Sequence, residues 1–366
     1  MLKPNLDLIL MPTFTCNMAC DYCYILDKCA GVMEISTARR AIEQDMEYND
    51  AKAPTNVYWH GAEPLLAGID FFREICDWTT RKYGLDSIHH HIQTNGTLLN
   101  EAWYELFIQY HITTGISLDG PQELNDGHRK FPSGKGSFDV VFRNIMEARK
   151  KKLFFDVLCV ITRETLEHVD ELFDFFYENK IDFGFEPLVA EDQVTQGALA
   201  ISPEEYAGAA IHLFDRWFFQ ADRRLRRVVP PYHFVHSLLT GVNSYCNFSA
   251  CCARRYLAVS PNGDIHSCIM FAGEPNFSFG NITRHTLDKI LCSPVRQQFL
   301  EIRSERIEKC RNCRWVKLCN SGCPHHALVG YGQLIAPDLF CKSYQQIFAH
   351  IERVLRGEIT NITKSN

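Results

Sequence analysis

Cys16-Asn-Met-Ala-Cys20-Asp-Tyr-Cys23 is the stretch around which the chain is organised, because its three thiols share one tight loop after an apolar run, Leu6–Met11. Thiolates are the protein ligands of iron–sulfur clusters, and a [4Fe–4S] cube has four irons to ligate. Three cysteine ligands leave one iron open, and a metal centre needs an open position to bind a reactant. The alternative is a structural zinc site, for which Cys29 is the candidate fourth ligand.

Composition and charge place the chain among ordinary globular proteins. Its 366 residues are 46% hydrophobic and 22% charged, which is enough for two domains and a large core. The net charge of −6 provides no basic field for nucleic acid, and no stretch approaches the ~20 apolar residues of a membrane span. Lys3 and Asp7 interrupt the first apolar run, unlike a signal peptide. We therefore expect a cytoplasmic protein that binds neither nucleic acid nor a membrane.

The distribution of the 16 cysteines indicates metal sites. Disulfides are rare in cytoplasmic proteins. The cysteines cluster at residues 16–23 and again between Cys246 and Cys341, with few in the long interval that separates these regions. Clustering towards both ends of the chain predicts two separate metal-binding regions.

The first half of the chain alternates short apolar runs with amphipathic ones, which is typical of βαβ units and a parallel sheet. Six such units predict an α/β fold with a partial (β/α)6 barrel, in which functional residues collect on the loops after the strands. The predicted strands are Leu6–Met11, Asn56–Trp59, Ile88–Gln93, Thr113–Leu118, Phe154–Ile161 and Asp182–Glu186. The predicted helices are Ser36–Asn49, Gly68–Tyr83, Asn100–Tyr110, Ser137–Lys151 and Arg163–Asn179, with Ser36 and Asn100 as N-caps.

Polar loops follow the second, third and fourth predicted strands. Glycine in the first loop lets the backbone approach a ligand closely, Glu63 can hold an ammonium group, and the planar fork of Arg129 can clamp a carboxylate. Each loop alone reads as an ordinary turn, but three of them behind a three-cysteine loop favour a ligand site. The loops are His60-Gly61-Ala62-Glu63-Pro64-Leu65, Gln93-Thr94-Asn95-Gly96-Thr97-Leu98 and Ser117-Leu118-Asp119-Gly120-Pro121.

In combination, these motifs resemble the radical S-adenosylmethionine (SAM) superfamily over most of residues 1–190. The resemblance implies that Cys16, Cys20 and Cys23 hold a [4Fe–4S] cluster whose open iron binds SAM, which is then cleaved to a 5′-deoxyadenosyl radical. Ala62 replaces the family's usual second glycine with another small residue. The implied cofactor-binding residues are Tyr22 and Leu188 at the adenosyl moiety, Ala62 and Glu63 at the amino group, Ser117 at the ribose and Arg129 at the carboxylate, together with Asn95 and Asp119 in the same loops.

The second cysteine region reads Cys246-x5-Cys252-x15-Cys268, then Cys310-x2-Cys313-x5-Cys319-x3-Cys323-x17-Cys341. Spacing alone admits a zinc site within the second group. The eight positions resemble the twin-cluster SPASM extension of radical SAM enzymes that modify peptides. That resemblance implies two auxiliary [4Fe–4S] clusters, three clusters in all. One auxiliary cluster would use Cys246, Cys252, Cys268 and Cys323, and the other Cys310, Cys313, Cys319 and Cys341, with Cys251 left as a free thiol.

The expected domain order follows from these motifs. We expect a radical SAM core over residues 1–190, a helical bridge over 191–243, a twin-cluster SPASM domain over 244–343, and a C-terminal helix and tail over 344–366. Ser202-Pro203-Glu204-Glu205 is a strong helix start in the bridge, and Ala258–Ile265 reads as a hairpin with an Asn-Gly turn. The arginine-rich run 223–227 is expected to be a solvated face, with a dock for an acidic peptide as the alternative.

The same resemblance implies a ribosomally made peptide or protein as the substrate. Anaerobic sulfatase maturases and cyclophane-forming maturases have the most similar patterns. Sulfatase maturases carry an Asp as general base directly after the third cysteine of the first auxiliary set, where this chain has Ile269, which cannot take a proton. We therefore expect side-chain cross-linking, with formylglycine formation from Cys or Ser as the alternative. The candidate catalytic residues are Tyr24, Glu186, Asp264 and His266.

The chemistry also implies partners. We expect a flavodoxin- or ferredoxin-type electron donor, and no leader-binding domain before Leu6, so that the barrel, bridge or SPASM surface recognises the substrate. The competing class is a non-catalytic iron–sulfur or zinc protein, either an electron carrier or a scaffold. That class explains the cysteines but leaves the three polar loops without a purpose.

Overall fold

The computed structural model describes most of the chain. The described residues are 5–25, 31–49, 54–191, 196–220, 222–243, 245–249 and 252–365, with the backbone alone described in 358–365. They form two compact units. The first unit comprises Met1–Leu118, Asn125–Asp156 and Cys251–Glu301, and the second comprises Asp119–Leu124, Val157–Ala250 and Ile302–Asn366.

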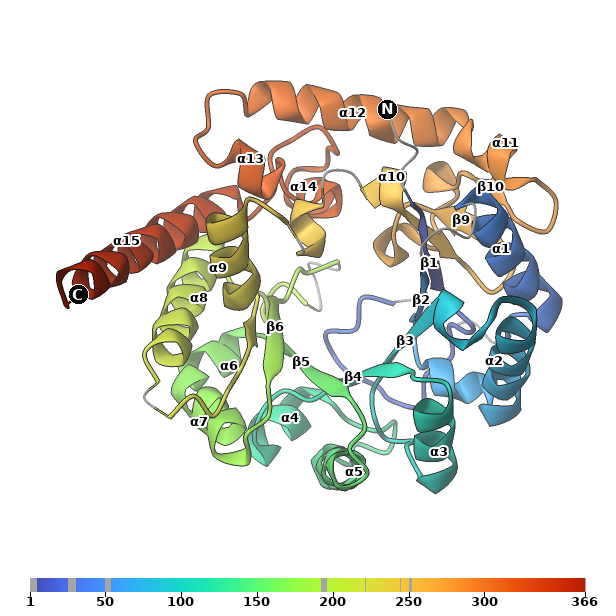
Figure 1. The fold of residues 1–366 in the computed structure, drawn as a ribbon, viewed down its shortest axis with the longest axis horizontal. Coiled ribbons are helices and arrows are strands. Elements are labelled where there is room, and N and C mark those ends of the chain that lie inside the picture. Colours follow the sequence, from blue (N-terminus) through green and yellow to red (C-terminus); the bar gives the residue numbers. More distant parts are fainter. Residues whose placement is uncertain are drawn as a thin grey trace. The chain divides into compact units, whose positions relative to one another are not determined.

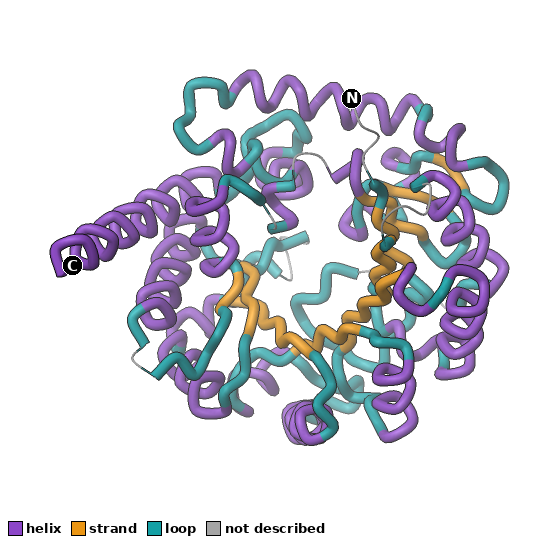
Figure 2. The backbone as a smooth tube through the Cα atoms, viewed as in Figure 1, coloured by secondary structure: helices purple, strands orange, loops and turns teal. Residues whose placement is uncertain are grey.

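The first unit contains a sheet with strand order β10-β9-β8-β1-β2-β3-β4. Strands β1 to β4 are parallel, so their carboxyl ends lie at one edge of the sheet. Figures 1 and 2 show these strands in one row, with α1, α2 and α3 along one side of it. The strands are β1 (Asp7–Leu10), β2 (Thr55–Trp59), β3 (Ile88–Thr94), β4 (Thr113–Ser117), β8 (Tyr256–Val259), β9 (Asp264–His266) and β10 (Gly280–Asn281).

Helices of the first unit are amphipathic and bury one face. In α1, for example, Ala38, Ala41, Ile42 and Met46 recur at helical spacing and are buried. The helices are α1 (Ile35–Tyr48), α2 (Ile69–Tyr83), α3 (Glu101–Gln109), α5 (Phe138–Lys150), α10 (Cys252–Arg255) and α11 (Leu287–Leu291), with 3₁₀ turns η1 (Pro64–Ala67), η2 (Leu85–Ser87), η4 (Ile269–Phe271) and η5 (Pro275–Phe277). Two more helices, α4 (Gln122–His128) and α12 (Pro294–Lys309), have residues in both units.

The second unit has a parallel trio of strands, β5 (Phe155–Ile161), β6 (Phe183–Pro187) and β7 (Val228–Val229). The long helix α15 packs against α8 and α9. An aromatic core, including Phe234, Phe248, Tyr344 and Phe348, fills this contact region. The helices are α6 (Arg163–Glu167), α7 (Val169–Asn179), α8 (Pro203–Phe218), α9 (Pro231–Thr240), α13 (Val316–Cys319), α14 (Pro324–Tyr331) and α15 (Cys341–Ser365), with η3 at Cys246–Phe248.

All six predicted strands and the predicted helical stretches are present, with ends shifted by a residue or two. Asn100 caps α3 as expected, because its Oδ1 accepts the Trp103 N–H at 3.3 Å. The prediction of Ser36 as an N-cap is wrong: α1 begins at Ile35, after Glu34. The stretch 163–179 forms two helices, α6 and α7, rather than one. Helix α4 was not predicted.

The expected hairpin is confirmed, and it has an unexpected neighbour. Strands β8 and β9 pair antiparallel around Asn262 and Gly263, as the Asn-Gly turn predicted. In addition, β8 pairs parallel with β1, with Leu8 opposite Leu257. This hairpin from the second cysteine region therefore extends the same sheet that carries the first cysteine loop.

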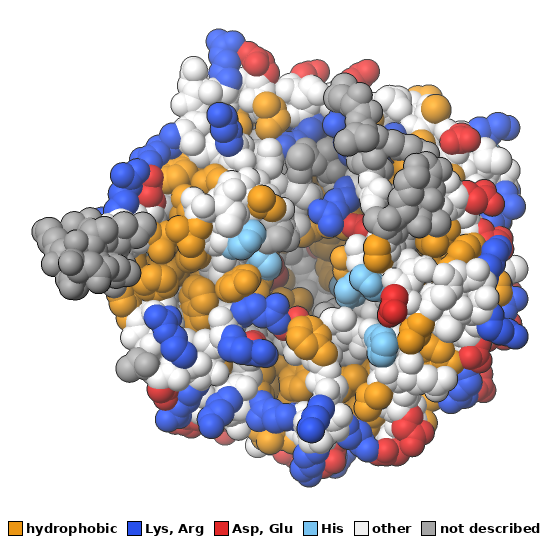
Figure 3. All heavy atoms as spheres, in the orientation of Figure 1, with side chains coloured by type: hydrophobic (Ala, Val, Ile, Leu, Met, Phe, Trp, Pro, Cys, Tyr) orange, Lys and Arg blue, Asp and Glu red, His pale blue; other side chains and the backbone are white. Residues whose placement is uncertain are grey.

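Charged side chains of both signs are distributed over the face shown in Figure 3. The arginine-rich run is engaged in local pairs: Arg224 lies 2.5 Å from Asp222, and Arg226 lies 3.1 Å from Asp182. This agrees with the expected solvated face. Burial alternates along β3 at His89-His90-His91, since His90 is buried and His89 is exposed. In the described part of the chain, no helix is both long and apolar enough to cross a membrane.

A buried carboxyl in α1 makes the stability depend on pH. Burial raises the pKa of Asp45 from 3.8 to about 8, and the hydrogen bonds from Thr55 and Asn49 only partly oppose this. The folded state therefore holds the proton more tightly than the unfolded state, so this contribution to stability is lost as the pH rises from 3.8 through about 8. We expect Asp45→Asn to raise the unfolding temperature relative to the parent protein, by a margin that widens up to about pH 8.

Thermal unfolding of both proteins over this pH range tests the prediction. The exposed Asp70→Asn variant is a suitable control, because Asp70 lies on the surface of α2, where it pairs with Arg73. A margin between Asp45→Asn and the parent protein that did not change with pH would contradict the assigned protonation state.

Candidate active site and auxiliary cluster site

The three-cysteine loop follows β1 and is fixed by the loop that follows β3. The Asn95 Nδ2 atom lies 3.8 Å from Cys16 Sγ and donates to Asn17 Oδ1 at 2.8 Å. Asn17 in turn donates to Thr97 Oγ1 at 2.8 Å. Within the loop, the Met18 N–H lies 3.4 Å from Cys16 Sγ. The predicted candidate Asn95 is therefore a partner of the cysteine loop itself.

Glu63 joins the loops that follow β2 and β3. Its carboxylate is fully buried and accepts hydrogen bonds from the backbone N–H groups of Leu65 and Asn95 and from Thr94 Oγ1, at 3.1, 2.7 and 2.7 Å. Burial raises the pKa of Glu63 to about 7, and these hydrogen bonds counteract part of the rise. The sequence identified Glu63 as a candidate but not this bridging role, because its partners lie about 30 residues away.

Gly61 is needed where the β2 loop meets the loop that follows β1. Its φ is +110°, a conformation that favours glycine, and an added Cβ would lie 3.1 Å from the Thr13 carbonyl oxygen. Glu63 donates its backbone N–H to Thr15 at 3.1 Å, just before the first cysteine. Gly61 thus lets the loop after β2 lie close to the backbone of the loop after β1, whereas the sequence predicted a close approach to a ligand.

Tyr22 and Arg129 lie together beside the cysteine loop. The Arg129 guanidinium carbon is 5.4 Å from the centre of the Tyr22 ring, and both residues are buried. His128 positions the loop through Asp21, with 3.0 Å between His128 Nδ1 and the carboxylate. Two residues that the resemblance assigned to opposite ends of one cofactor therefore pack on each other. Their contacts with SAM stay a prediction.

Tyr24 lies where the first cysteine loop and the second cysteine region meet within the first unit. Burial raises the pKa of its phenol strongly, and the nearby thiols of Cys23, Cys268 and Cys16 raise it further. The hydroxyl is 3.4 Å from both His60 Nδ1 and the Gly61 carbonyl oxygen. Tyr24 is therefore a protonated phenol, available as a hydrogen-bond donor rather than as a base.

Four of the predicted auxiliary ligands surround one cavity in the second unit. Cys310, Cys313, Cys319 and Cys341 line a space of about 230 Å³, and Trp315, Asp338 and Tyr344 complete much of the wall. Burial raises the pKa of Cys319 to about 12, and the neighbouring thiols of Cys341, Cys313 and Cys310 add to the rise. Four thiols around a cavity of this volume provide the donor set of a polynuclear iron–sulfur cluster.

The other four predicted auxiliary ligands are divided between the units. Cys252 and Cys268 belong to the first unit, and Cys246 and Cys323 belong to the second. Their assignment to one cluster stays a prediction. Cys29 and Cys251 lie outside the described residues, so their expected roles stay open.

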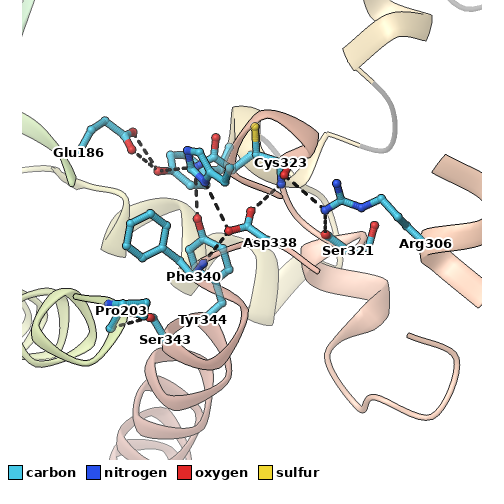
Figure 4. Close-up of polar contacts among 12 residues, drawn as sticks. Glu186, Pro203, Arg306, Ser321, Cys323, Asp338, Phe340, Ser343 and Tyr344 are labelled. Carbon is cyan, nitrogen blue, oxygen red and sulfur yellow. Dashed lines mark hydrogen bonds and ion pairs between the residues drawn. The ribbon is translucent and has the colours of Figure 1, made fainter. Parts of the chain in front are cut away.

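Glu186, at the carboxyl end of β6, is the candidate base with the most informative surroundings. Its two carboxylate oxygens lie 2.8 and 2.7 Å from the Tyr245 hydroxyl, which donates to them (Figure 4). Burial raises the pKa of Glu186 to about 7, whereas the Tyr245 hydrogen bond and nearby His326 lower it. A carboxyl with a pKa near neutrality can both accept and release a proton under working conditions.

The remaining candidates have the following surroundings, and their predicted roles stay predictions. Asp264 accepts from Asn281 Nδ2 at 2.8 Å and from Asn262 Nδ2 at 2.8 Å, which ties it to the hairpin. Asp119 is fully buried and accepts the Val160 N–H at 3.0 Å. Ser117 Oγ accepts from Gln93 Nε2 at 3.1 Å, and Leu188 is buried. His266 is buried in β9, and burial lowers its pKa.

These features define a class of protein. A parallel α/β sheet with a three-cysteine loop beyond its first strand, together with a four-cysteine cavity, is the architecture of an iron–sulfur enzyme, and the thiolate donor sets fit such clusters. The Radical SAM superfamily matches residues 10–176, and an iron–sulfur cluster-binding domain, SPASM, matches residues 246–314. The chain therefore contains a radical SAM domain followed by a SPASM domain, which confirms the resemblance seen in the sequence.

Relatives of similar length extend this finding. The chain is 28% identical over 362 residues to a cysteine-type anaerobic sulfatase-maturating enzyme of Clostridium novyi, with 94% of each chain covered. It is 28% identical over 354 residues to a serine-type enzyme of Klebsiella aerogenes, covering 93% of this chain and 84% of the relative. Among solved structures, anSMEcpe with bound AdoMet and the Cp18Cys peptide superposes with a TM-score of 0.86 at 26% identity, over 98% of this chain and 100% of the other.

Proposed function

We propose that this protein uses SAM to oxidise a side chain of a ribosomally made peptide or protein, closing a cross-link such as a cyclophane. The observation that carries the choice of cross-linking is Ile269, which follows Cys268, and Glu186, a buried carboxyl with a pKa of about 7 at the end of β6, is the proposed proton acceptor. Peptide recognition is supported by the similarity to anSMEcpe, which was solved with a bound peptide.

The residues present fit the proposed cofactors. When bound, SAM and three [4Fe–4S] clusters would supply a radical that removes one hydrogen atom from the substrate and an acceptor for the electron that must leave afterwards. Loss of that electron also releases a proton. Glu186 is the residue proposed to accept it, with the Tyr245 hydroxyl holding the carboxylate in place. A flavodoxin- or ferredoxin-type protein is the proposed electron donor.

Ile269 favours cross-linking over formylglycine formation. It follows Cys268 directly and begins the 3₁₀ turn η4, at the position where the sulfatase-maturase pattern has an acidic general base. An alkyl side chain there cannot deprotonate a small substrate thiol or hydroxyl. Oxidation with ring closure instead needs a proton acceptor near the substrate carbon, which is the role proposed for Glu186.

Formylglycine formation is the second candidate. It is favoured by the similarity to a cysteine-type and a serine-type sulfatase-maturating enzyme, of which 94% and 84% are covered. In that reaction Glu186 would have to replace the missing base. Asp264 is a weaker substitute, because Asn281 and Asn262 already engage its carboxylate.

The product distinguishes these two functions. We expect incubation of the reconstituted enzyme with SAM, a reductant and its peptide to remove two hydrogens per event, because one hydrogen atom, one electron and one proton leave the substrate. Tandem mass spectrometry should then show no fragments from cleavage between the joined residues, since a ring holds them together. Ordinary fragmentation with the mass change on a single Ser, or sulfur loss from a Cys, would instead identify formylglycine.

A non-catalytic electron carrier or scaffold can be recognised without any peptide product, because it would not cleave SAM. Iron and sulfide analysis with an assay for 5′-deoxyadenosine separates it from the enzyme, for which we expect about twelve irons per chain and SAM cleavage. Zinc at the cysteines, or iron without cleavage of SAM, would contradict the proposed function.

A further inference from the structure

One buried carboxylate lies between the four-cysteine cavity and a cysteine outside it. Asp338 is only 1% exposed and lines the cavity with Cys310, Cys313, Cys319 and Cys341. Its Oδ2 atom accepts the backbone N–H of Cys323 at 2.6 Å, and its Oδ1 atom accepts the Phe340 N–H at 2.8 Å (Figure 4). Asp338 therefore lines the cavity of one predicted ligand set and accepts a hydrogen bond from Cys323, a member of the other.

The turn that links these sets is shaped around this carboxylate. Gly322 has a φ of +70°, and a Cβ added there would lie 2.3 Å from Asp338 Oδ2. On the other side of the turn, the buried Arg306 donates to the carbonyl oxygens of Ser321 and Cys323. A buried anion at the N–H side and a buried cation at the carbonyl side thus hold the short connection between Cys319 and Cys323.

A histidine completes the surroundings of the carboxylate. His326 Nδ1 lies 3.3 Å from Asp338 Oδ1, and the negative charge of Asp338 raises the pKa of His326 against the opposing effect of burial. The electrostatic influence of Glu186 also reaches His326. The carboxylate is thus held by two backbone N–H groups and faces one imidazole, which fixes its position.

We propose that Asp338 is a positioning residue that holds Cys323 relative to the four-cysteine site and sets the reduction potential of the auxiliary cluster there. The inference rests on the cluster assignment of the proposed function. A fixed negative charge in the wall of a cluster cavity disfavours addition of an electron, so it lowers the potential. The hydrogen bond to the Cys323 N–H further ties the two auxiliary sets together.

The test is a redox titration of the full chain, followed by electron paramagnetic resonance. We expect Asp338→Asn to keep all of its iron and to shift the midpoint potential of one auxiliary signal upward. Glu308→Gln is the matched control, because this substitution removes the same charge two residues from Cys310. Unlike Asp338, Glu308 is exposed and pairs with Arg311. The control should leave the potential where it is in the parent protein.

A second variant moves the potential the other way. His326→Gln removes the imidazole that balances Asp338 but keeps the carboxylate, so the same signal should shift downward. If Asp338→Asn lost auxiliary iron while Glu308→Gln kept it, the positioning role would be supported and His326→Gln would still test the potential. If Asp338→Asn and His326→Gln both kept their full iron content and left the midpoint potential unchanged, the proposal would be overturned. A parent protein lacking auxiliary iron would instead overturn the proposed function.

Discussion

A Cys20→Ala variant should release no 5′-deoxyadenosine while keeping both auxiliary clusters. Cys20 is one of only three thiolates predicted to hold the SAM-binding cluster, and a cube with two protein ligands and two open irons is not retained. Iron content should therefore fall by about one third, from about twelve to about eight irons per chain. Anaerobic reconstitution, iron and sulfide analysis and chromatography of the nucleoside product measure both effects.

The matched control is Cys292→Ala. Cys292 is an exposed thiol that belongs to none of the three predicted ligand sets, so its loss should change neither iron content nor SAM cleavage. If the Cys20→Ala protein still cleaved SAM at the parent rate, the loop at residues 16–23 would not be the SAM-binding site, and the proposed reaction would be wrong.

A Glu186→Gln variant should cleave SAM but form almost no peptide product. Glutamine has the same shape, and its side-chain oxygen can still accept the hydrogen bond from the Tyr245 hydroxyl, but it cannot act as a base. Loss of a general base lowers the rate by about 100-fold to 10,000-fold. The measurement is the ratio of 5′-deoxyadenosine to modified peptide, which should rise sharply because hydrogen abstraction continues without oxidation.

The pH dependence gives a second readout at the same residue. Glu186 acts as a base only when it is ionised, so product formation in the parent protein should rise with pH through about 7. Tyr245→Phe removes a hydrogen bond that lowers the Glu186 pKa, so the rise should move to higher pH. Normal product yield in Glu186→Gln, or a pH profile that Tyr245→Phe leaves unchanged, would exclude Glu186 as the proton acceptor.

The sequence predicted the elements that depend on local patterns. Alternation of buried and exposed positions locates β3, and the Asn100 cap locates the start of α3, because both signals lie within a few residues of each other. The prediction that Ser36 caps α1 was wrong although it also used a local signal. A capping residue type close to a helix start is a common occurrence, and here the chain enters α1 one residue before it.

The site could be predicted only in part. The resemblance to the SPASM extension, rather than spacing alone, led to the four thiols that line one cavity. The role of Glu63 was missed because its partners Thr94 and Asn95 come from the next strand end. Asp338 was not predicted at all, since a single Asp in a loop carries no signal until its burial and its contact with Cys323 are known.

By itself, the sequence determined the class of this protein, because the motifs that carry the resemblance to the radical SAM core and the SPASM domain are local properties of the chain. The tertiary structure alone decided which groups far apart in the chain meet. It placed β8 beside β1, buried Glu186 under the Tyr245 hydroxyl, and set Asp338 against the turn at Gly322. The physical reason is that burial and long-range pairing set the pKa and the hydrogen bonds of a carboxylate, and both depend on the packing of the whole unit.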